Sequence, residues 1–163
     1  MIFLGVDPAL RNTGYALLKK RDNNIEYIAS GIISTGKIEM PLAIAQIMNE
    51  IMTLCQTYKP YRASMEKIFI NQNPESSIKL SHARGAIMGV LAQNNIPIEE
   101  YAPNFIKKAI AGAGRADKEQ MKQMINMLVP GHNFIQHDQI DAIAIAYTSI
   151  LHQNLNQALE KIF

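Results

Sequence analysis

This chain of 163 residues lacks most of the features that would assign it to a specialised class of protein. Its one cysteine, Cys55, cannot form a disulfide within the chain, so we expect a reduced, buried thiol. The formal net charge is only +2, so any surface that binds nucleic acid must be local. No apolar run approaches the length that spans a bilayer, and no signal peptide is visible. We therefore expect a cytoplasmic protein.

Motifs of several common enzyme classes are also missing. There is no GxxxxGK[ST] phosphate-binding loop, no GxSxG nucleophile elbow and no Cys/His pattern for zinc. The composition is that of a compact protein, with 48% hydrophobic and 18% charged residues. Together with the length, it predicts a single domain over residues 1–163 with a full core of its own.

Three strands are predicted at the start of the chain. The apolar run at residues 2–6 ends at Asp7, and Pro8 does not continue a central strand. Strand-like runs at residues 14–20 and 25–35 follow, joined by a polar turn. Because no helix fits between them, these three strands should form an antiparallel meander.

Beyond the meander the chain alternates helices and strands. The expected elements are a helix opened by Pro41, a strand at residues 62–69, a loop at 71–77, a helix at roughly 76–94, a strand at 96–101, a helix at 103–111, a helix opened by Asp117, and a last helix from near His137 to the end. This order predicts an α/β fold with a five-stranded mixed sheet, in which two parallel strands extend the meander and helices cover both faces.

Small residues recur in the predicted helix at 76–94, at Ala83, Gly85, Ala86 and Gly89. They would allow another backbone to approach closely. That backbone could belong to the sheet or to a second copy of the same helix, and packing in the core is the safer of the two interpretations.

Four carboxylates could share a metal ion. Asp7 ends a strand, Glu66 lies within or near the end of another, and Asp138 and Asp141 are three residues apart on one helix face. Four converging acids would repel one another unless cations neutralised them, and Mg²⁺ suits such a site. Two such ions roughly 3.5–4 Å apart can activate water and stabilise the leaving oxygen of a phosphodiester. His137, beside this turn, is a possible ligand or proton carrier.

Simpler interpretations of these acids remain open. Asp7 before a proline could cap a turn, and acids at the start of a helix suit the helix dipole. The most basic segment has the same ambiguity, because a solvent-exposed helix face would also explain it. Its cations are Lys107, Lys108, Arg115, Lys118 and Lys122.

Five sequence strings occur in a fixed order along the chain. They are GVDP with TGY at residues 5–8 and 13–15, ExxF at 66–69, NxxSxxKLxxARG at 73–85, GxGxAxK at 112–118, and DxxDAxAIA at 138–146. In these strings and their spacing the chain resembles the RuvC-type Holliday junction resolvases, bacterial endonucleases with a ribonuclease H-like fold. The resemblance covers nearly the whole length.

The resemblance implies a set of roles. Asp7, Glu66, Asp138 and Asp141 would bind two divalent ions, usually Mg²⁺ with Mn²⁺ as a substitute, and Asp138 is favoured over His137 as the fourth ligand. Lys107 and Lys118 would act near the scissile phosphate, and Phe69 would lie against bases at the junction. Further DNA contacts are expected from Lys79, Arg84, Lys108, Arg115 and Lys122. Such enzymes act as homodimers on four-way DNA, cut two opposing strands symmetrically, and cooperate with the RuvA–RuvB branch-migration complex.

Two departures and three rival functions accompany this resemblance. Ala9 and Ala16 stand where the family usually has glycine, so the turn after Asp7 could differ in its geometry.

One rival function is that of a ribonuclease H acting on RNA–DNA hybrids, which would not account for the string at residues 73–85. The others are half of a sugar-kinase or actin-like ATPase, for which the chain is too short, and a junction-binding module without catalysis.

Overall fold

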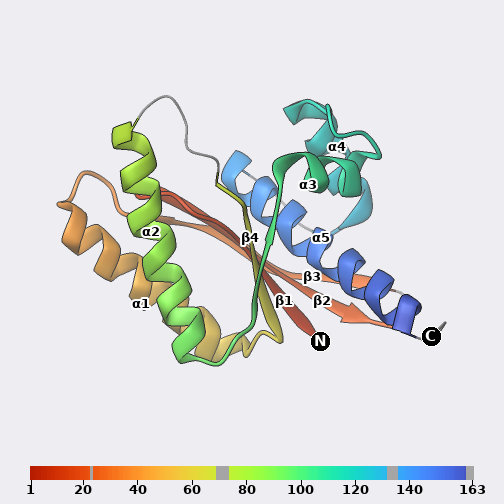
Figure 1. Ribbon diagram of the computed structural model, residues 1–163, viewed down its shortest axis with the longest axis horizontal. Coiled ribbons are helices and arrows are strands. Elements are labelled where there is room, and N and C mark those ends of the chain that lie inside the picture. Colours follow the sequence, from red (N-terminus) through yellow and green to blue (C-terminus); the bar gives the residue numbers. More distant parts are fainter. Residues whose placement is uncertain (23, 69–73, 132–135, 161–163) are drawn as a thin grey trace.

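The computed structural model describes residues 1–22, 24–68, 74–131 and 136–160, apart from the side chains of 156–160. Its centre is one five-stranded sheet with the order β3-β2-β1-β4-β5 (Figure 1). Antiparallel pairing joins β1 to β2 and β2 to β3, whereas β1–β4 and β4–β5 are parallel. This confirms the predicted meander extended by two parallel strands. The strands are β1 (Ile2–Asp7), β2 (Asn12–Arg21), β3 (Asn24–Ser34), β4 (Arg62–Glu66) and β5 (Ile98–Tyr101).

Helices cover both faces of the sheet, as predicted. On one face lie α1 (Met40–Tyr58) and α2 (Pro74–Gln93), which pack on each other and on the sheet. On the other face α5 (His137–Glu160) crosses β1 and β2, with α3 (Pro103–Ala111) and α4 (Lys118–Leu128) beside it (Figure 1).

Strand β1 is buried on both sides, which explains its continuous apolar sequence. Phe3 packs into the core under α5, while Leu4 and Val6 pack into the core under α1 and α2. All three side chains are fully buried. Asp7 is the residue at which this strand leaves the core, and it is half-buried.

The structure corrects two predicted boundaries. Strand β4 ends at Glu66, whereas a strand to Phe69 was predicted, and Lys67 and Ile68 are exposed outside the sheet. Helix α2 begins at Pro74, within the predicted loop, because proline is tolerated in the first turn, where its missing N–H has no partner to lose. Phe69 lies outside the described residues.

The small residues of α2 do not all face the core. Ala83 is fully buried, but Gly85 and Gly89 are exposed, and a Cβ at either glycine would have no atom within 4 Å. The core interpretation is therefore wrong for the two glycines. None of the described helices combines the length with the hydrophobicity of a transmembrane segment.

Candidate active site

The first two acids are brought together by the parallel pairing of β1 and β4. In that pairing Val6 lies beside Met65, so the next residues, Asp7 and Glu66, end neighbouring strands at the same edge of the sheet. The carboxyl ends of parallel strands are where open α/β sheets bind their ligands. Both acids are half-buried.

The other two acids reach this edge because two glycines let α5 lie directly on the sheet. A Cβ at Gly5 would lie 2.1 Å from the carbonyl oxygen of Ala142, and one at Gly14 would lie 2.1 Å from that of Asp138. Gly14 is paired with Asp7 across β1 and β2. The first turn of α5, with Asp138 and Asp141, is thereby held over the end of β1.

A pocket of about 310 Å³ opens where these elements meet. It contains three of the four predicted acids, both predicted catalytic lysines and His137, against an apolar wall. Asp138 is not among its lining residues, although it is only half-buried. The lining residues are Asp7, Glu66, Pro103, Ile106, Lys107, Asp117, Lys118, Met121, His137, Ile140, Asp141, Ala144 and Ile145.

Asp7 has the largest electrostatic perturbation in the pocket. Its pKa is raised from 3.8 to about 7, and burial is the largest cause. The negative charges of Asp141, Glu66 and Asp138 raise this pKa further, while the positive charge of Lys118 lowers it. The charges of the three other predicted acids therefore all reach Asp7, which spacing along the sequence alone did not show.

The pKa values of the neighbouring acids follow the same pattern. Burial and then the charge of Asp141 raise the pKa of Glu66, against the opposing effect of Lys107. Asp141 is exposed at the residue level, yet partial burial of its carboxylate raises its pKa, and the charge of Asp138 raises it further, with Lys118 as the largest opposing influence. The two lysines only partly offset the negative charge of the pocket, and a bound cation would relieve the remaining repulsion.

The donor set suits a hard divalent cation, because carboxylate oxygens are the ligands that such ions prefer. Within the described ranges, no group of three or more His, Cys, Asp and Glu side chains is arranged so that it could hold a metal ion. Binding a cation would therefore require the carboxylates to move closer together. His137 lines the pocket, whereas Asp138 acts on Asp7 and Asp141 through its charge, so the choice between them as a ligand stays a prediction.

Asp117 is a pocket residue that the sequence patterns did not identify as part of the site. It caps α4, where its Oδ1 accepts a hydrogen bond from the backbone N–H of Gln120 at 2.9 Å. The Gln120 side chain in turn accepts from the Asp117 backbone N–H, which completes a capping box. One feature of the sequence could have identified it. Asp117 directly precedes Lys118, a predicted site residue at the start of the same helix, so the two must lie close together.

The remaining predicted DNA contacts lie outside the pocket. Lys108 and Arg115 are exposed, Lys122 is half-buried, and Lys79 is exposed and paired with Glu75 one helical turn away. Their contacts with DNA stay predictions, and the predicted role of Phe69 falls outside the described residues.

The structure corrects the role predicted for Arg84. Its side chain is 8% exposed, and its guanidinium group contacts the backbone of Glu66 and the carboxylate of Glu100. A buried guanidinium that is already engaged by protein acceptors is not presented to DNA.

The turn after Asp7 tolerates the two alanines that depart from the family pattern. Neither Ala9 nor Ala16 is among the non-glycine residues with positive φ, and the buried Thr13 side chain closes the turn. Its Oγ1 accepts from the Ala9 N–H at 3.2 Å and donates to the Ala9 carbonyl oxygen at 2.6 Å. Alanine therefore introduces no backbone strain at either position.

Comparisons with known proteins agree with this architecture. The family model described as crossover junction endodeoxyribonuclease RuvC matches residues 3–149. The RuvC protein of Orientia tsutsugamushi (strain Boryong) is 44% identical over 156 residues, covering 95% of this chain and 98% of the relative. That of Rickettsia typhi is 43% identical over 153 residues, covering 93% and 98%.

Solved structures show the same fold. Thermus thermophilus RuvC in complex with a Holliday junction substrate superposes with a TM-score of 0.90 at 21% identity, covering 96% of each chain. The yeast mitochondrial Holliday junction resolvase gives a TM-score of 0.67 at 14% identity, covering 97% of this chain and 83% of that one. The match to the family model and the identities to its members over almost the full length show that this chain belongs to the RuvC family of crossover junction endodeoxyribonucleases.

Proposed function

We propose that this chain resolves Holliday junctions by hydrolysing one phosphodiester in each of two opposing strands, with two Mg²⁺ ions held by Asp7, Glu66, Asp138 and Asp141. Membership of the RuvC family makes it a structure-selective endodeoxyribonuclease of recombination and repair. The observation that carries the assignment of the site is the meeting of Asp7, Glu66 and Asp141 in one pocket at the ends of β1 and β4, where burial and the charges of the other acids raise the pKa of Asp7 to about 7. A pocket so rich in negative charge favours binding of a divalent cation.

The residues of the pocket would have different roles in the reaction. The four carboxylates would hold the ions, which supply an activated water and stabilisation of the leaving oxygen when bound. Lys107 and Lys118 enter the pocket from α3 and α4 and would contact the phosphate, since their charges already reach Glu66, Asp7 and Asp141. Ile106 and Met121 form part of the apolar wall of the pocket.

We further propose that one nuclease domain spans the chain and that two copies act together on the four-way junction. Support for one domain comes from the two cores, which lie on opposite faces of a single sheet. Support for pairing comes from Gly85 and Gly89 on α2, where a second backbone could approach without a clash. Symmetric cleavage of two strands requires two such sites, and cooperation with the RuvA–RuvB complex is part of the same proposal.

The test is a Mg²⁺-dependent cleavage assay on a synthetic four-way junction, with linear duplex DNA and an RNA–DNA hybrid as matched substrates. We expect paired cuts in opposing strands of the junction, and little or no cleavage of the other two. Preferential cleavage of the hybrid would favour a ribonuclease H activity. Tight junction binding without cleavage in Mg²⁺ or Mn²⁺ would favour a binding module.

A further inference from the structure

Arg84 lies in the middle of α2 and, among the residues that the structure describes, is the one Lys, Arg, Asp or Glu that is buried. Its Nη1 donates a hydrogen bond to the backbone carbonyl oxygen of Glu66 at 2.7 Å. Its other terminal nitrogen forms an ion pair with the carboxylate of Glu100 on β5. Burial lowers the pKa of the guanidinium group, so the fold accommodates this charge at a desolvation cost.

These contacts bear directly on a pocket residue. Glu66 is the last residue of β4, so the regular hydrogen bonding of the strand ends there. The backbone N–H of Lys67 donates to the carbonyl oxygen of Tyr101 at 2.8 Å, while Arg84 holds the carbonyl of the same peptide unit. The peptide that follows Glu66 is thus fixed from two sides, and with it the direction in which the Glu66 side chain leaves the backbone.

We infer that Arg84 is a positioning residue: by fixing the backbone carbonyl of Glu66, it directs the Glu66 carboxylate into the pocket. Glu100, in turn, holds the Arg84 side chain in place. This inference rests on the proposed function, since it concerns a carboxylate that would bind the cation. Groups that orient a metal ligand without touching the metal commonly change metal affinity by about 10–100-fold when they are removed.

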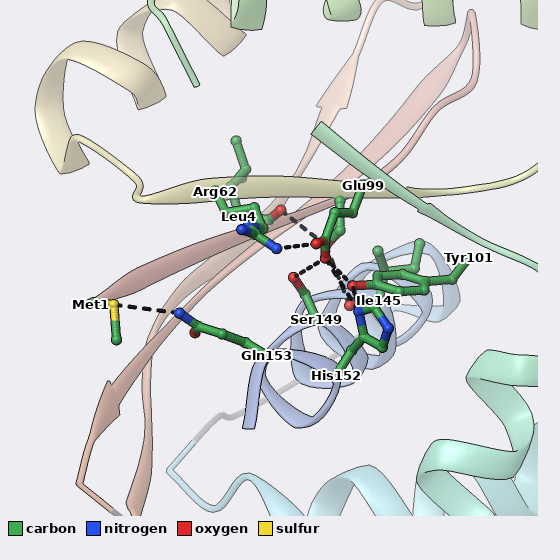
Figure 2. A network of polar contacts seen from close by, with 10 residues as sticks. Met1, Leu4, Arg62, Glu99, Tyr101, Ile145, Ser149, His152 and Gln153 are labelled. Atoms are coloured by element: carbon green, nitrogen blue, oxygen red, sulfur yellow. Dashed lines mark hydrogen bonds and ion pairs between the residues drawn. The ribbon is translucent and has the colours of Figure 1, made fainter. Parts of the chain in front are cut away.

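The opposite face of the sheet offers a matched control. Glu100 faces α2, and the preceding residue, Glu99, faces α5, because successive side chains of a strand alternate. Glu99 pairs with Arg62 at the start of β4, with side chains 23% and 21% exposed (Figure 2). Arg62→Gln therefore removes an Arg–Glu pair made by the neighbouring residue of β5, and neither member of that pair contacts Glu66.

The experiment compares Arg84→Gln, Arg84→Lys and Arg62→Gln with the unmodified protein. Two Mg²⁺ midpoints are measured: that of the thermal shift of the free protein, and that of junction cleavage. Junction affinity in EDTA is measured alongside. We expect Arg84→Gln to raise both midpoints by about tenfold or more with junction affinity unchanged. Arg84→Lys should restore part of this loss, because lysine keeps the charge with fewer donors. Arg62→Gln should lower thermal stability and leave both midpoints unchanged.

Unchanged midpoints in Arg84→Gln, or equal increases in Arg84→Gln and Arg62→Gln, would overturn the inference and leave Arg84 a structural residue. Where Arg84→Gln gives too little folded protein, Glu100→Gln tests the same claim, because it removes the pair that holds the guanidinium against Glu66. The proposed function is tested separately by Glu66→Gln. Cleavage by that variant at the unmodified rate would refute the site itself, whatever Arg84 does.

Discussion

Gly14 on β2 and Asp138 on α5 are in direct backbone contact, such that a Cβ on the glycine would lie 2.1 Å from the Asp138 carbonyl oxygen. This contact sets the height of the first turn of α5 above the sheet. Gly5 makes the equivalent contact with Ala142 one turn later. The distance between the strand-end acids and the helix acids therefore depends on two residues that carry no functional group.

Gly14→Ala should displace the start of α5 and so impair metal binding and cleavage. Overpacking of this kind costs about 1–3 kcal/mol, which corresponds to roughly 2–4 °C in Tm per kcal/mol for a chain of this size. Ala16→Gly is the control, because Ala16 is buried on the same strand and its substitution destabilises without pushing the helix. At comparable loss of Tm, Gly14→Ala should need more Mg²⁺ for half-maximal cleavage. Equal Mg²⁺ midpoints in the two variants would contradict this view.

The raised pKa of Asp7 predicts how stability changes with pH. The folded-state pKa, about 7, exceeds the unfolded value near 3.8, so the folded protein binds more protons between these values. The contribution of Asp7 to stability therefore falls as pH rises through this window. In EDTA, Asp7→Asn should raise Tm at pH 8 and flatten the decline between pH 5 and 8.

Thermal unfolding of both proteins at the two pH values checks this, with the exposed Glu50→Gln as the control. Mg²⁺ should raise the Tm of the unmodified protein at pH 8 and have little effect on Asp7→Asn. An Asp7→Asn variant that is less stable than the unmodified protein at pH 8 in EDTA would show that the carboxylate is not under repulsion.

Asp117 should matter through its cap on α4, whose first residue is Lys118. Asp117→Ala removes the cap and should cost about 1 kcal/mol of stability, whereas asparagine is an equally good capping residue. We expect Asp117→Ala to lower both Tm and the single-turnover cleavage rate, and Asp117→Asn to keep Tm near the original value. Equal Tm values for all three proteins would exclude a capping role.

The exposed glycines of α2 predict a dimer contact. Gly89→Leu adds a side chain where the monomer has open space, so the fold of each copy should be preserved while close approach of a second copy is blocked. Sedimentation velocity at micromolar concentration should show a dimer for the unmodified protein and dissociation for the variant. A monomeric unmodified protein would refute the dimer, whereas an unaffected variant dimer would place the pairing surface elsewhere.

The fold was largely predictable because its elements have strong patterns and clear end signals. The apolar run before Asp7, the helix opened by Pro41 and the short helix at Pro103–Ala111 all occur where the sequence predicted them. The end of β4 was not predictable, because apolar residues continue past Glu66. Strand β4 ends where its pairing with β1 and β5 ends, and the sequence near Glu66 does not show where that is.

The residue types of the site could be predicted from the sequence, but the contacts that bring those residues together could not. Two acids at strand ends and two on one helix turn suggested a shared pocket, but their proximity depends on contacts of Gly5 and Gly14 with residues of α5, which lie far away in the sequence. Arg84 was misassigned for a related reason. The resemblance placed Arg84 among the DNA contacts, and only its contacts with Glu66 and Glu100 in the folded chain reveal that its side chain is buried.

The most direct test of the central claim is Asp7→Asn, assayed for junction binding and for Mg²⁺-dependent cleavage in the same preparation. The substitution removes one carboxylate from the cluster and leaves the side chains of Lys107 and Lys118 in place. We expect cleavage to be abolished while junction affinity stays close to that of the unmodified protein. Cleavage by Asp7→Asn at the unmodified rate would contradict the assignment of these four acids as the catalytic centre.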